Sequence, residues 1–249
     1  MATVTEIYPD YATALVACGP GYDDSDIAEV IAFKAAQRID PRVVVPEQAL
    51  NSIVAVGMAG ADIRNRQLNV LDFGGGCGFH YFHVATAMRM PLRWAIVETP
   101  TMAARAARLA QNYFRVFTAI GDAAAALEGV DLVHASSSIQ YVPDPPAVLK
   151  AFAALRPRHI LLARLPLWRE PTIVGVQISP LSGNGIGPMP PDIRDRQVKY
   201  PVTFMNTDDI FRMLDGYDLA LAMASPSSSY VVRGKPVPGV SLVFRAKGA

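Results

Sequence analysis

The chain has 249 residues, of which 51% are hydrophobic and 18% are charged, and its formal net charge is +1. This composition is typical of a globular chain and excludes an intrinsically disordered one. At this length roughly three-quarters of the unfolded surface can be buried, so the fold does not depend on disulfides or metals. A near-zero charge without any run of Lys or Arg argues against nucleic acid or an anionic membrane as the partner.

The cysteines and the N-terminus restrict the compartment. Cys18 and Cys77 lie far apart, match no metal-ligand spacing and are too few for a disulfide framework. The first residues include Glu6 and Asp10 and lack the basic start and apolar stretch of a secretory signal. No apolar run approaches the roughly 20 residues that cross a bilayer. We therefore expect a cytoplasmic protein without a membrane partner.

The first part of the chain is predicted to be a helical extension over residues 1–66. An N-cap cluster at 24–26 precedes apolar residues at helical spacing, and Pro46 opens a second helix that reaches Met58. From residue 67 strands alternate with helices of about ten residues, which predicts βαβ units and a parallel sheet. The expected strands are 68–73, 94–98, 116–119, 130–136 and 159–165, with helices at 79–90, 99–112 and 145–155 and a short helix that begins at 121 between them.

The stretch 166–202 breaks this alternation. It holds seven prolines and four glycines, which predicts a long loop that acts as a lid or binding segment. A capped helix at 207–214 follows, and then two strands at 219–224 and 240–246. The turn-rich segment between those two strands indicates an antiparallel hairpin at the C-terminus.

One motif carries most of the functional information. The sequence VLDFGGGCG over residues 70–78 is a strand that runs into a glycine-rich turn, and Asp72, Gly74, Gly76 and Gly78 fall on alternate positions. Glycines let the backbone turn sharply and approach a ligand closely. The helix that follows points its N-terminal amide groups at the same place. The motif resembles the first motif of class I S-adenosylmethionine-dependent methyltransferases, an acidic residue followed by GxGxG.

Neighbouring residues extend this resemblance. Glu98 ends the second strand 20 residues after Gly78, where the family pattern implies an acidic side chain that binds the two ribose hydroxyls. Asp122 follows the third strand, where the family places an acidic residue near the adenine amino group. The turn at 155–157 is similar to the LKPGG turn of the family but lacks its two glycines. As simpler alternatives, Asp72 and Glu98 could be ordinary strand ends, and Asp122 could only cap its helix.

The resemblance spans residues 68–246 and implies an α/β Rossmann-like methyltransferase fold. In that fold a seven-stranded, mostly parallel sheet ends in an antiparallel C-terminal hairpin. Residues 67–249 would form the S-adenosylmethionine-binding domain, with 166–202 as a lid and 1–66 on the acceptor side. The pieces GYDDSDI, VLDFGGGCGFHYF and ASSSIQYV are also similar to methyltransferases from bacterial polysaccharide and natural-product gene clusters.

The catalytic candidates follow the first and fourth strands. His80 begins the helix after the glycines and could hold the cofactor carboxylate or act as a base, or merely make a structural hydrogen bond. Ser136, a candidate cofactor contact, and Tyr141 follow the fourth strand, at the edge where parallel sheets bind ligands. Tyr141 is the second candidate for a base or acceptor contact, unless it only packs. We expect His83 to pack, His134 to be a core histidine, and Arg164, Arg169 and Glu170 to be solvated.

The predicted function is methyl transfer from S-adenosylmethionine to a small-molecule acceptor, preferably an oxygen of a metabolite or sugar. No acidic residue follows the fourth strand for a metal, so none is expected, and no DPPY-like motif marks a DNA-base enzyme. A homodimer is left open. Two alternatives remain: a non-catalytic S-adenosylmethionine-binding protein, and a nicotinamide-dependent reductase. The second needs G-x-G-x-x-G, and Phe79 or Tyr81 stands at the third glycine position in the two available frames.

Overall fold

The computed structural model describes residues 2–4, 6–37, 45–63 and 66–248, and its centre is a seven-stranded sheet. The strand order is β10-β13-β7-β6-β3-β4-β5, and only β13 runs antiparallel to its neighbours. The strands are β3 (Leu68–Phe73), β4 (Leu92–Val97), β5 (Arg115–Phe117), β6 (Leu132–Ser136), β7 (His159–Pro166), β10 (Tyr217–Ala224) and β13 (Gly239–Ala246). The predicted fold class is confirmed.

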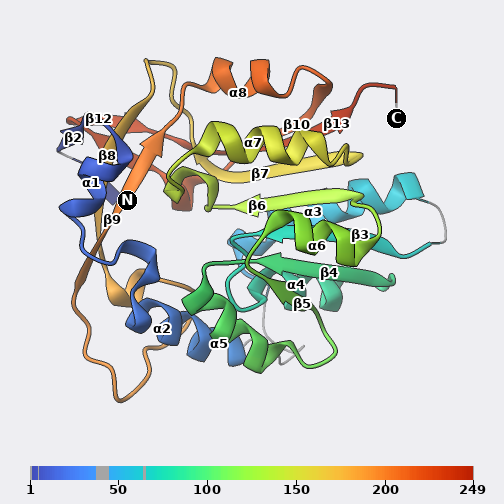
Figure 1. Cartoon of the computed structure of the whole chain (residues 1–249), viewed down its shortest axis with the longest axis horizontal. Coiled ribbons are helices and arrows are strands. Elements are labelled where there is room, and N and C mark those ends of the chain that lie inside the picture. The colour runs from blue at the N-terminus through green and yellow to red at the C-terminus, as the bar shows by residue number, and fades with distance from the viewer. Residues whose placement is uncertain (1, 5, 38–44, 64–65, 249) are drawn as a thin grey trace.

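Helices cover both faces of this sheet, because its strands carry apolar side chains on both sides. In β3, for example, Val70 packs in the core beneath α3 and α4, whereas the next residue, Leu71, packs beneath α6. Figure 1 shows α6, α7 and α8 on one side of the strands. The helices are α1 (Tyr11–Val16), α2 (Ser25–Ala36), α3 (Glu47–Ile63), α4 (Phe79–Ala87), α5 (Pro100–Ala110), α6 (Ile120–Leu127), α7 (Pro145–Ala154) and α8 (Thr207–Met213).

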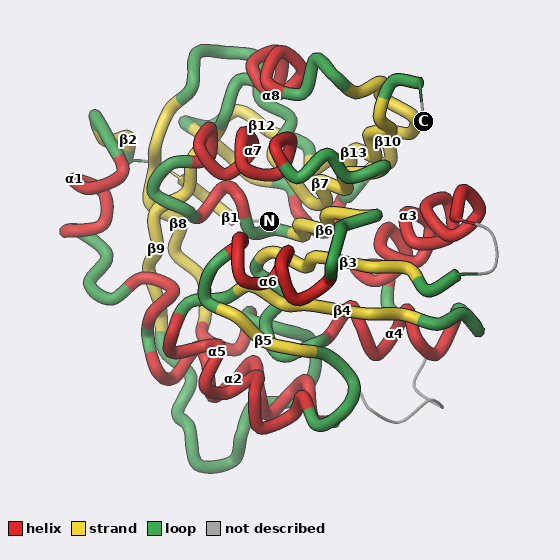
Figure 2. Tube along the Cα trace, turned by 45° about the vertical axis from the view of Figure 1, so that its right-hand side comes forward, coloured by secondary structure: helices red, strands yellow, loops and turns green. Residues whose placement is uncertain are grey.

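A second sheet stands beyond the carboxyl ends of the parallel strands. In Figure 1 the arrows of β4 and β6 point toward β9, and Figure 2 shows β8 and β9 running across that edge of the first sheet. Its order is β12-β11-β1-β8-β2, with β9 paired to β8. The strands are β1 (Ala2–Val4), β2 (Ile7–Tyr8), β8 (Ile173–Pro180), β9 (Gln197–Phe204), β11 (Tyr230–Val232) and β12 (Lys235–Val237).

This second sheet corrects two predictions. The stretch 166–202 is not a long loop, because β8 and β9 pair antiparallel over their full length from Ile173 opposite Phe204 to Pro180 opposite Gln197. The first 66 residues are not purely helical either, since β1 and β2 both pair with β8. The C-terminal pairing of β10 with β13 is confirmed, and the segment between those two strands adds β11 and β12.

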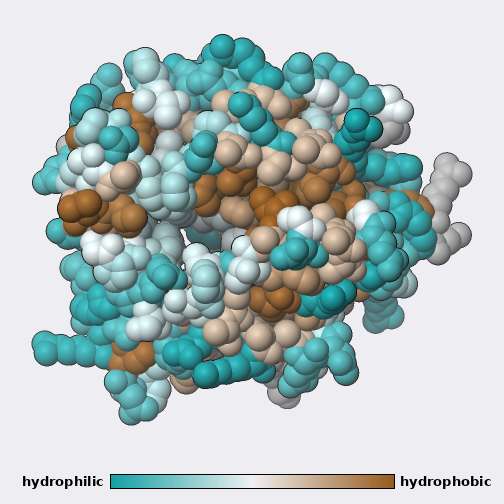
Figure 3. Space-filling view, in the orientation of Figure 1, coloured by the Kyte–Doolittle hydropathy of each residue, from teal (hydrophilic) through white to brown (hydrophobic). Residues whose placement is uncertain are grey.

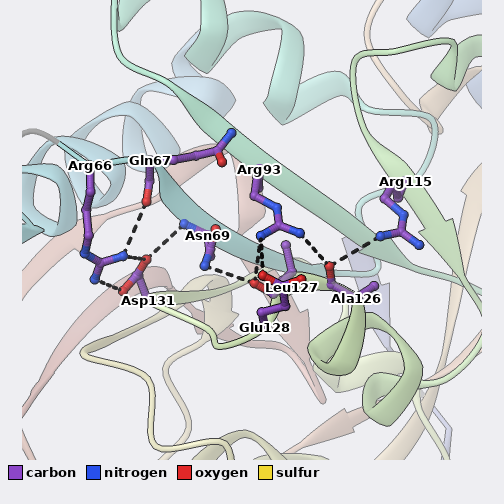
Figure 4. A network of polar contacts seen from close by, with 9 residues as sticks. All are labelled: Arg66, Gln67, Asn69, Arg93, Arg115, Ala126, Leu127, Glu128 and Asp131. Carbon is purple, nitrogen blue, oxygen red and sulfur yellow. Dashed lines mark hydrogen bonds and ion pairs between the residues drawn. The ribbon is translucent and has the colours of Figure 1, made fainter.

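A polar network fixes the opposite, amino-terminal edge of the seven-stranded sheet (Figure 4). The Asp131 carboxylate accepts hydrogen bonds from the Arg66 guanidinium and from the backbone amide of Asn69. The Arg93 and Arg115 guanidinium groups donate to the carbonyl of Ala126, at the end of α6. These contacts tie the connections between strands and helices together, far from the carboxyl edge.

The surface in the orientation of Figure 3 shows apolar residues gathered between α6 and α7, with hydrophilic residues around them. Within the residues that the structure describes, none of the helices combines the length and the apolar character that a membrane crossing needs.

Candidate active site

A cavity of about 900 Å³ lies between the two sheets, at the carboxyl ends of β3, β4, β6 and β7. This is the edge at which open α/β sheets bind ligands. Its wall combines segments from the whole chain. From the seven-stranded sheet come Gly74–Gly76, Glu98, Ser136–Ser138 and Arg164, from the helices Ile31 and His80, and from the second sheet Gln177, Ser179, Tyr200 and Tyr230.

The glycine motif forms one side of this cavity. Gly74 and Gly76 line it and have positive φ angles of 70° and 56°, a conformation that favours glycine. A Cβ atom on Gly74 would lie 2.3 Å from the Cβ of Ser138, so the backbone needs glycine there for packing as well. Gly78 does not line the cavity; its φ of 85° favours glycine, and a Cβ on it would lie 2.4 Å from the Phe114 ring.

Glu98 follows β4 and faces the cavity beside the glycines. Its Oε1 accepts a hydrogen bond from the backbone amide of Gly76 at 2.8 Å, and its Oε2 accepts one from the amide of Thr99 at 3.0 Å. Burial raises the pKa of Glu98 to about 7, against the opposing effect of these two hydrogen bonds. Each oxygen keeps a second lone pair, so the carboxylate can still accept hydrogen bonds from a ligand.

Besides Gly78, two more of the predicted cofactor residues, Asp72 and Asp122, do not line the cavity. Asp72 is fully buried beneath the glycine turn, where its Oδ2 accepts from the indole N–H of Trp94 at 3.0 Å. A Cβ on Gly75 would lie 2.3 Å from that oxygen, which shows how closely the turn covers the carboxylate. Asp122 is exposed in the first turn of α6 and is not part of the cavity wall.

Asp72 instead begins a buried chain of hydrogen bonds that ends at the cavity. His134 Nδ1 lies 2.7 Å from Asp72 Oδ1, and Ser52 Oγ lies 2.8 Å both from His134 Nε2 and from His80 Nδ1. All four side chains are buried, with exposures of 0% for Asp72, Ser52 and His134 and 6% for His80. His134 is the core histidine that the sequence predicted, but Ser52, from the N-terminal extension, was not foreseen.

This series of hydrogen bonds determines which ring nitrogen of His80 can accept a proton. If His134 Nδ1 donates to the Asp72 carboxylate, its Nε2 accepts from the Ser52 hydroxyl, so the Ser52 oxygen accepts from His80 Nδ1–H. The lone pair of His80 is then on Nε2, and His80 lines the cavity. Burial, followed by the proximity of His134 and Arg164, holds the pKa of His80 well below its usual value, so the ring is neutral.

Tyr141 lines the cavity as predicted, but it is not suited to accept a proton. Its hydroxyl lies 2.9 Å from Gln177 Oε1, to which it donates, and 2.8 Å from the Tyr230 hydroxyl. Burial and the neighbouring Tyr230 raise the pKa of Tyr141 well above its ordinary value. The ring also packs against Tyr22, with the ring centres 4.8 Å apart. Tyr141 therefore belongs to an aromatic and polar part of the cavity wall.

The segment after β6 and the end of β7 complete the site. Ser136 lines the cavity as predicted, and the buried hydroxyls of Ser136 and Ser138 have no hydrogen-bond partner in the structure. Arg164 was expected to be solvated, yet it is partly buried and also lines the cavity. The sequence carried one signal for this: a charged residue inside the apolar strand HILLARLP, near its carboxyl end.

No family model matches the sequence, and no curated protein matches it either. Solved structures do match. An S-adenosylmethionine-dependent methyltransferase from Clostridium acetobutylicum is 10% identical, with 82% of this chain and 93% of that chain covered and a TM-score of 0.52. The CcbJ methyltransferase from Streptomyces caelestis is 13% identical, with 90% and 99% covered and a TM-score of 0.51.

A third match is CalS10, an amino pentose methyltransferase from Micromonospora echinaspora that was solved with S-adenosylmethionine bound. It is 15% identical, with 86% of this chain and 96% of that chain covered and a TM-score of 0.48. At these identities the likeness shows the fold alone. The chain has the Rossmann-like fold of class I S-adenosylmethionine-dependent methyltransferases.

Proposed function

We propose that this protein is an S-adenosylmethionine-dependent methyltransferase that methylates an oxygen of a small molecule. The observation that carries the proposal is that one cavity is lined both by groups that suit a nucleoside and by a group that can accept a proton. On one side a glycine turn and the Glu98 carboxylate offer a surface for a nucleoside, and on the other His80 offers a neutral imidazole nitrogen. The fold supports the same conclusion, because the matched structures are methyltransferases.

The residues present fit the cofactor. Gly74 and Gly76 place no side chain in the cavity, so the backbone can approach a ligand, and Glu98 can accept hydrogen bonds from a pair of hydroxyls. When bound, S-adenosylmethionine supplies a methyl group on a positively charged sulfur, which an acceptor oxygen can attack directly. The protein then contributes mainly proximity and orientation, which can lower a barrier by roughly 7–11 kcal/mol.

His80 would take the proton that a hydroxyl acceptor loses. Because Nδ1 lies 2.8 Å from the Ser52 hydroxyl, Nε2 is the ring nitrogen left to carry a lone pair toward a ligand in the cavity that His80 lines. A base that is neutral before the reaction can accept a proton during it. The positive charge that forms on His80 lies at one end of a hydrogen-bonded chain whose other end is the Asp72 carboxylate. The charge is therefore compensated inside the protein.

The cofactor part of the proposal can be tested by calorimetry with S-adenosylhomocysteine, the demethylated cofactor, and with NAD as the competing nucleotide. We expect the first to bind and the second not to bind. Gly76→Val should abolish binding, since it places a side chain at the cavity wall. Gly234→Val is the matched control: Gly234 also has a positive φ, of 78°, but it does not line the cavity and has open space around its Cβ position. Binding of NAD alone, or normal binding by the Gly76 variant, would contradict the proposal.

A further inference from the structure

The end of β7 holds a feature that the reaction described above does not use. Arg164 has a φ of 59°, which lies in the left-handed region that residues other than glycine seldom adopt. Such a conformation is unfavourable for a residue with a side chain and persists only where the surroundings enforce it. A β-bulge enforces it here: Leu162 pairs with Leu242 and Leu165 with Val240, so Ala163 and Arg164 together face Ser241. A bulge re-aims a side chain, and this one turns Arg164 to the cavity.

The charge of Arg164 is not balanced by the protein. Within the described part of the chain no carboxylate forms an ion pair with it, and its side chain donates one hydrogen bond there, from Nε to Ser228 Oγ at 2.8 Å. Of the described residues in the cavity wall, Glu98 alone is acidic. Glu98 follows β4, three strands away from β7 in the sheet, which corresponds to roughly 14 Å. Glu98 is also held by two backbone amides.

Further hydrogen-bond donors lie beside Arg164. Ser136 pairs with Ala163 in the sheet, and the backbone amide of Ser137 donates to the carbonyl of Ala163 at 2.9 Å. The segment 136–138 is thus adjacent to the bulge. The hydroxyls of Ser136 and Ser138 are buried without a partner, although buried polar groups in proteins are usually hydrogen-bonded. A planar guanidinium beside two unused hydroxyls is a set of donors that matches a carboxylate or a phosphate.

We propose that Arg164, together with Ser136 and Ser138, binds an anionic group of the methyl acceptor, so that the substrates are small hydroxylated acids or phosphates. This rests on the proposed function, which supplies the acceptor. It also connects recognition to proton transfer. The charge of Arg164 is one of the causes that lower the pKa of His80. An anion on Arg164 offsets that charge, so His80 becomes a stronger base when the correct acceptor is in place.

The test uses three probes of similar shape: benzoate, phenyl phosphate and neutral benzamide. Binding is measured by NMR on the isotope-labelled protein, with and without S-adenosylhomocysteine. We expect at least one anion to shift the signals of residues 136–138 and 164 and to bind about tenfold or more tightly than benzamide. Arg164→Gln should remove this preference and leave the affinity for S-adenosylhomocysteine within about twofold. The relative strength of the two anions tells a carboxylate from a phosphate as the natural group.

Arg156→Gln is the matched control. Arg156 also has a left-handed backbone conformation, with a φ of 50°, but its side chain is exposed and lies outside the cavity wall. It should retain the preference. Equal binding of anions and benzamide, or no anion-induced shift at millimolar concentration, overturns the inference. A loss of S-adenosylhomocysteine binding in Arg164→Gln also overturns it, since the anion is then the cofactor's own carboxylate. Failure of the wild-type protein to bind S-adenosylhomocysteine refutes the proposed function instead, and the probe measurement without it still decides the role of Arg164.

Discussion

The ionisation of Glu98 couples this site to pH. Burial raises its pKa to about 7 from an ordinary value of 4.5. For an acid whose pKa is raised in the folded state, the contribution to folding stability is full below the unfolded pKa and is lost as the pH rises through the folded pKa. Without ligand, Glu98 therefore favours the folded state least above about pH 7. The ionised carboxylate that binds hydroxyl groups costs stability, and a bound ligand can offset this cost.

We expect the affinity for S-adenosylhomocysteine to rise with pH, by up to about tenfold per pH unit below pH 7, and then to level off. The reason is that the protonated carboxyl loses an acceptor and must be ionised before it can bind the ribose fully. In Glu98→Gln this rise should vanish, and the affinity at pH 8 should fall by about ten- to a hundredfold. Calorimetry across the pH range measures both. An identical pH profile in wild type and variant would show that Glu98 does not contact the ligand.

The buried chain from Asp72 to His80 makes a second residue-scale prediction. Ser52→Ala removes the hydroxyl that joins the two imidazoles, so the free energy of unfolding should fall by about 1–3 kcal/mol. The same loss of stability is expected if Ser52 only supports the fold and does not set the tautomer of His80. The distinguishing readout is the ¹⁵N chemical shifts of the His80 ring, which should report a proton on Nδ1 in the wild type and a mixture of tautomers in the variant.

Ser52→Thr keeps the hydroxyl and should restore the wild-type tautomer of His80, even if the added methyl group lowers stability. A wild-type His80 that carries its proton on Nε2 would contradict the assignment. In that case the ring could not serve as a base toward the cavity.

The sequence located the residues of this site that belong to local motifs. Gly74, Gly76 and Glu98 line the cavity because each follows directly from a strand end. For Asp72 the motif indicated the position and not the direction of the side chain: alternate residues of β3 face opposite sides, and Asp72 points into the core toward His134. The wall residues Arg164, Gln177, Tyr200 and Tyr230, and Ser52 behind His80, were not predicted as site residues, because they reach the site only through tertiary contacts between distant segments.

At the scale of elements, the sequence predicted the helices and strands that carry strong periodicity or capping residues. Thr99 before Pro100 marked the start of α5, and its Oγ1 does accept a hydrogen bond from the amide of Met102. Asp144 caps α7 in the same way, with Ala147 as the donor. Such signals are local, so they survive in a single sequence.

The hairpin of β8 and β9 shows where this approach fails. Pro171, Pro180 and Pro201 and the glycines between them indicated a loop, since proline is depleted in strands. Yet Pro180 is only the last residue of β8, and Pro201 lies in β9, which pairs on one side only among the described strands and is therefore an edge strand that tolerates proline. Gly175 is required inside β8 because a Cβ there would lie 2.3 Å from Val4 Cγ1. β8 pairs along its whole length with β9, and it also pairs with β1 and β2 from the start of the chain; no local sequence pattern reports these pairings.

At the scale of the whole molecule, residues from each third of the chain line the cavity. The seven-stranded sheet contributes the glycine turn, while α2 and the segment between β8 and β9 face it from the other side. Tyr11, in α1, donates from its hydroxyl to the carbonyl of Tyr141 at 2.6 Å, which ties the first helix to the segment after β6. The N-terminal extension therefore contributes to the cavity, and its place on the acceptor side stays a prediction.

Lys34 joins α2 to the segment between β8 and β9, two parts of the cavity wall that lie opposite the glycine turn. It is buried in α2, with 2% of its surface exposed, and its Nζ donates to the carbonyls of Ser182 at 2.6 Å and Gly185 at 3.2 Å. Burial lowers the pKa of Lys34, and the nearby Asp195 partly opposes this. An ammonium buried at this cost holds the segment 182–185 against α2, where Gly183, Asn184 and Gly185 face the cavity.

Lys34→Met keeps the apolar stem and removes both hydrogen bonds, so the segment 181–187 should open more often. Because each bond to a charged group contributes about 1.5–3 kcal/mol, amide hydrogen exchange there should accelerate by about ten- to a hundredfold, while the β8–β9 pairs remain protected. Affinity for S-adenosylhomocysteine should fall as well, since one wall of the cavity is loosened. Lys199→Met, on the exposed side of β9, is the control and should change neither quantity. Unchanged exchange in 181–187 of the Lys34 variant would mean that the segment is held by its own contacts, such as those between Ser182 and Asp195, and that Lys34 does not control access to the cavity.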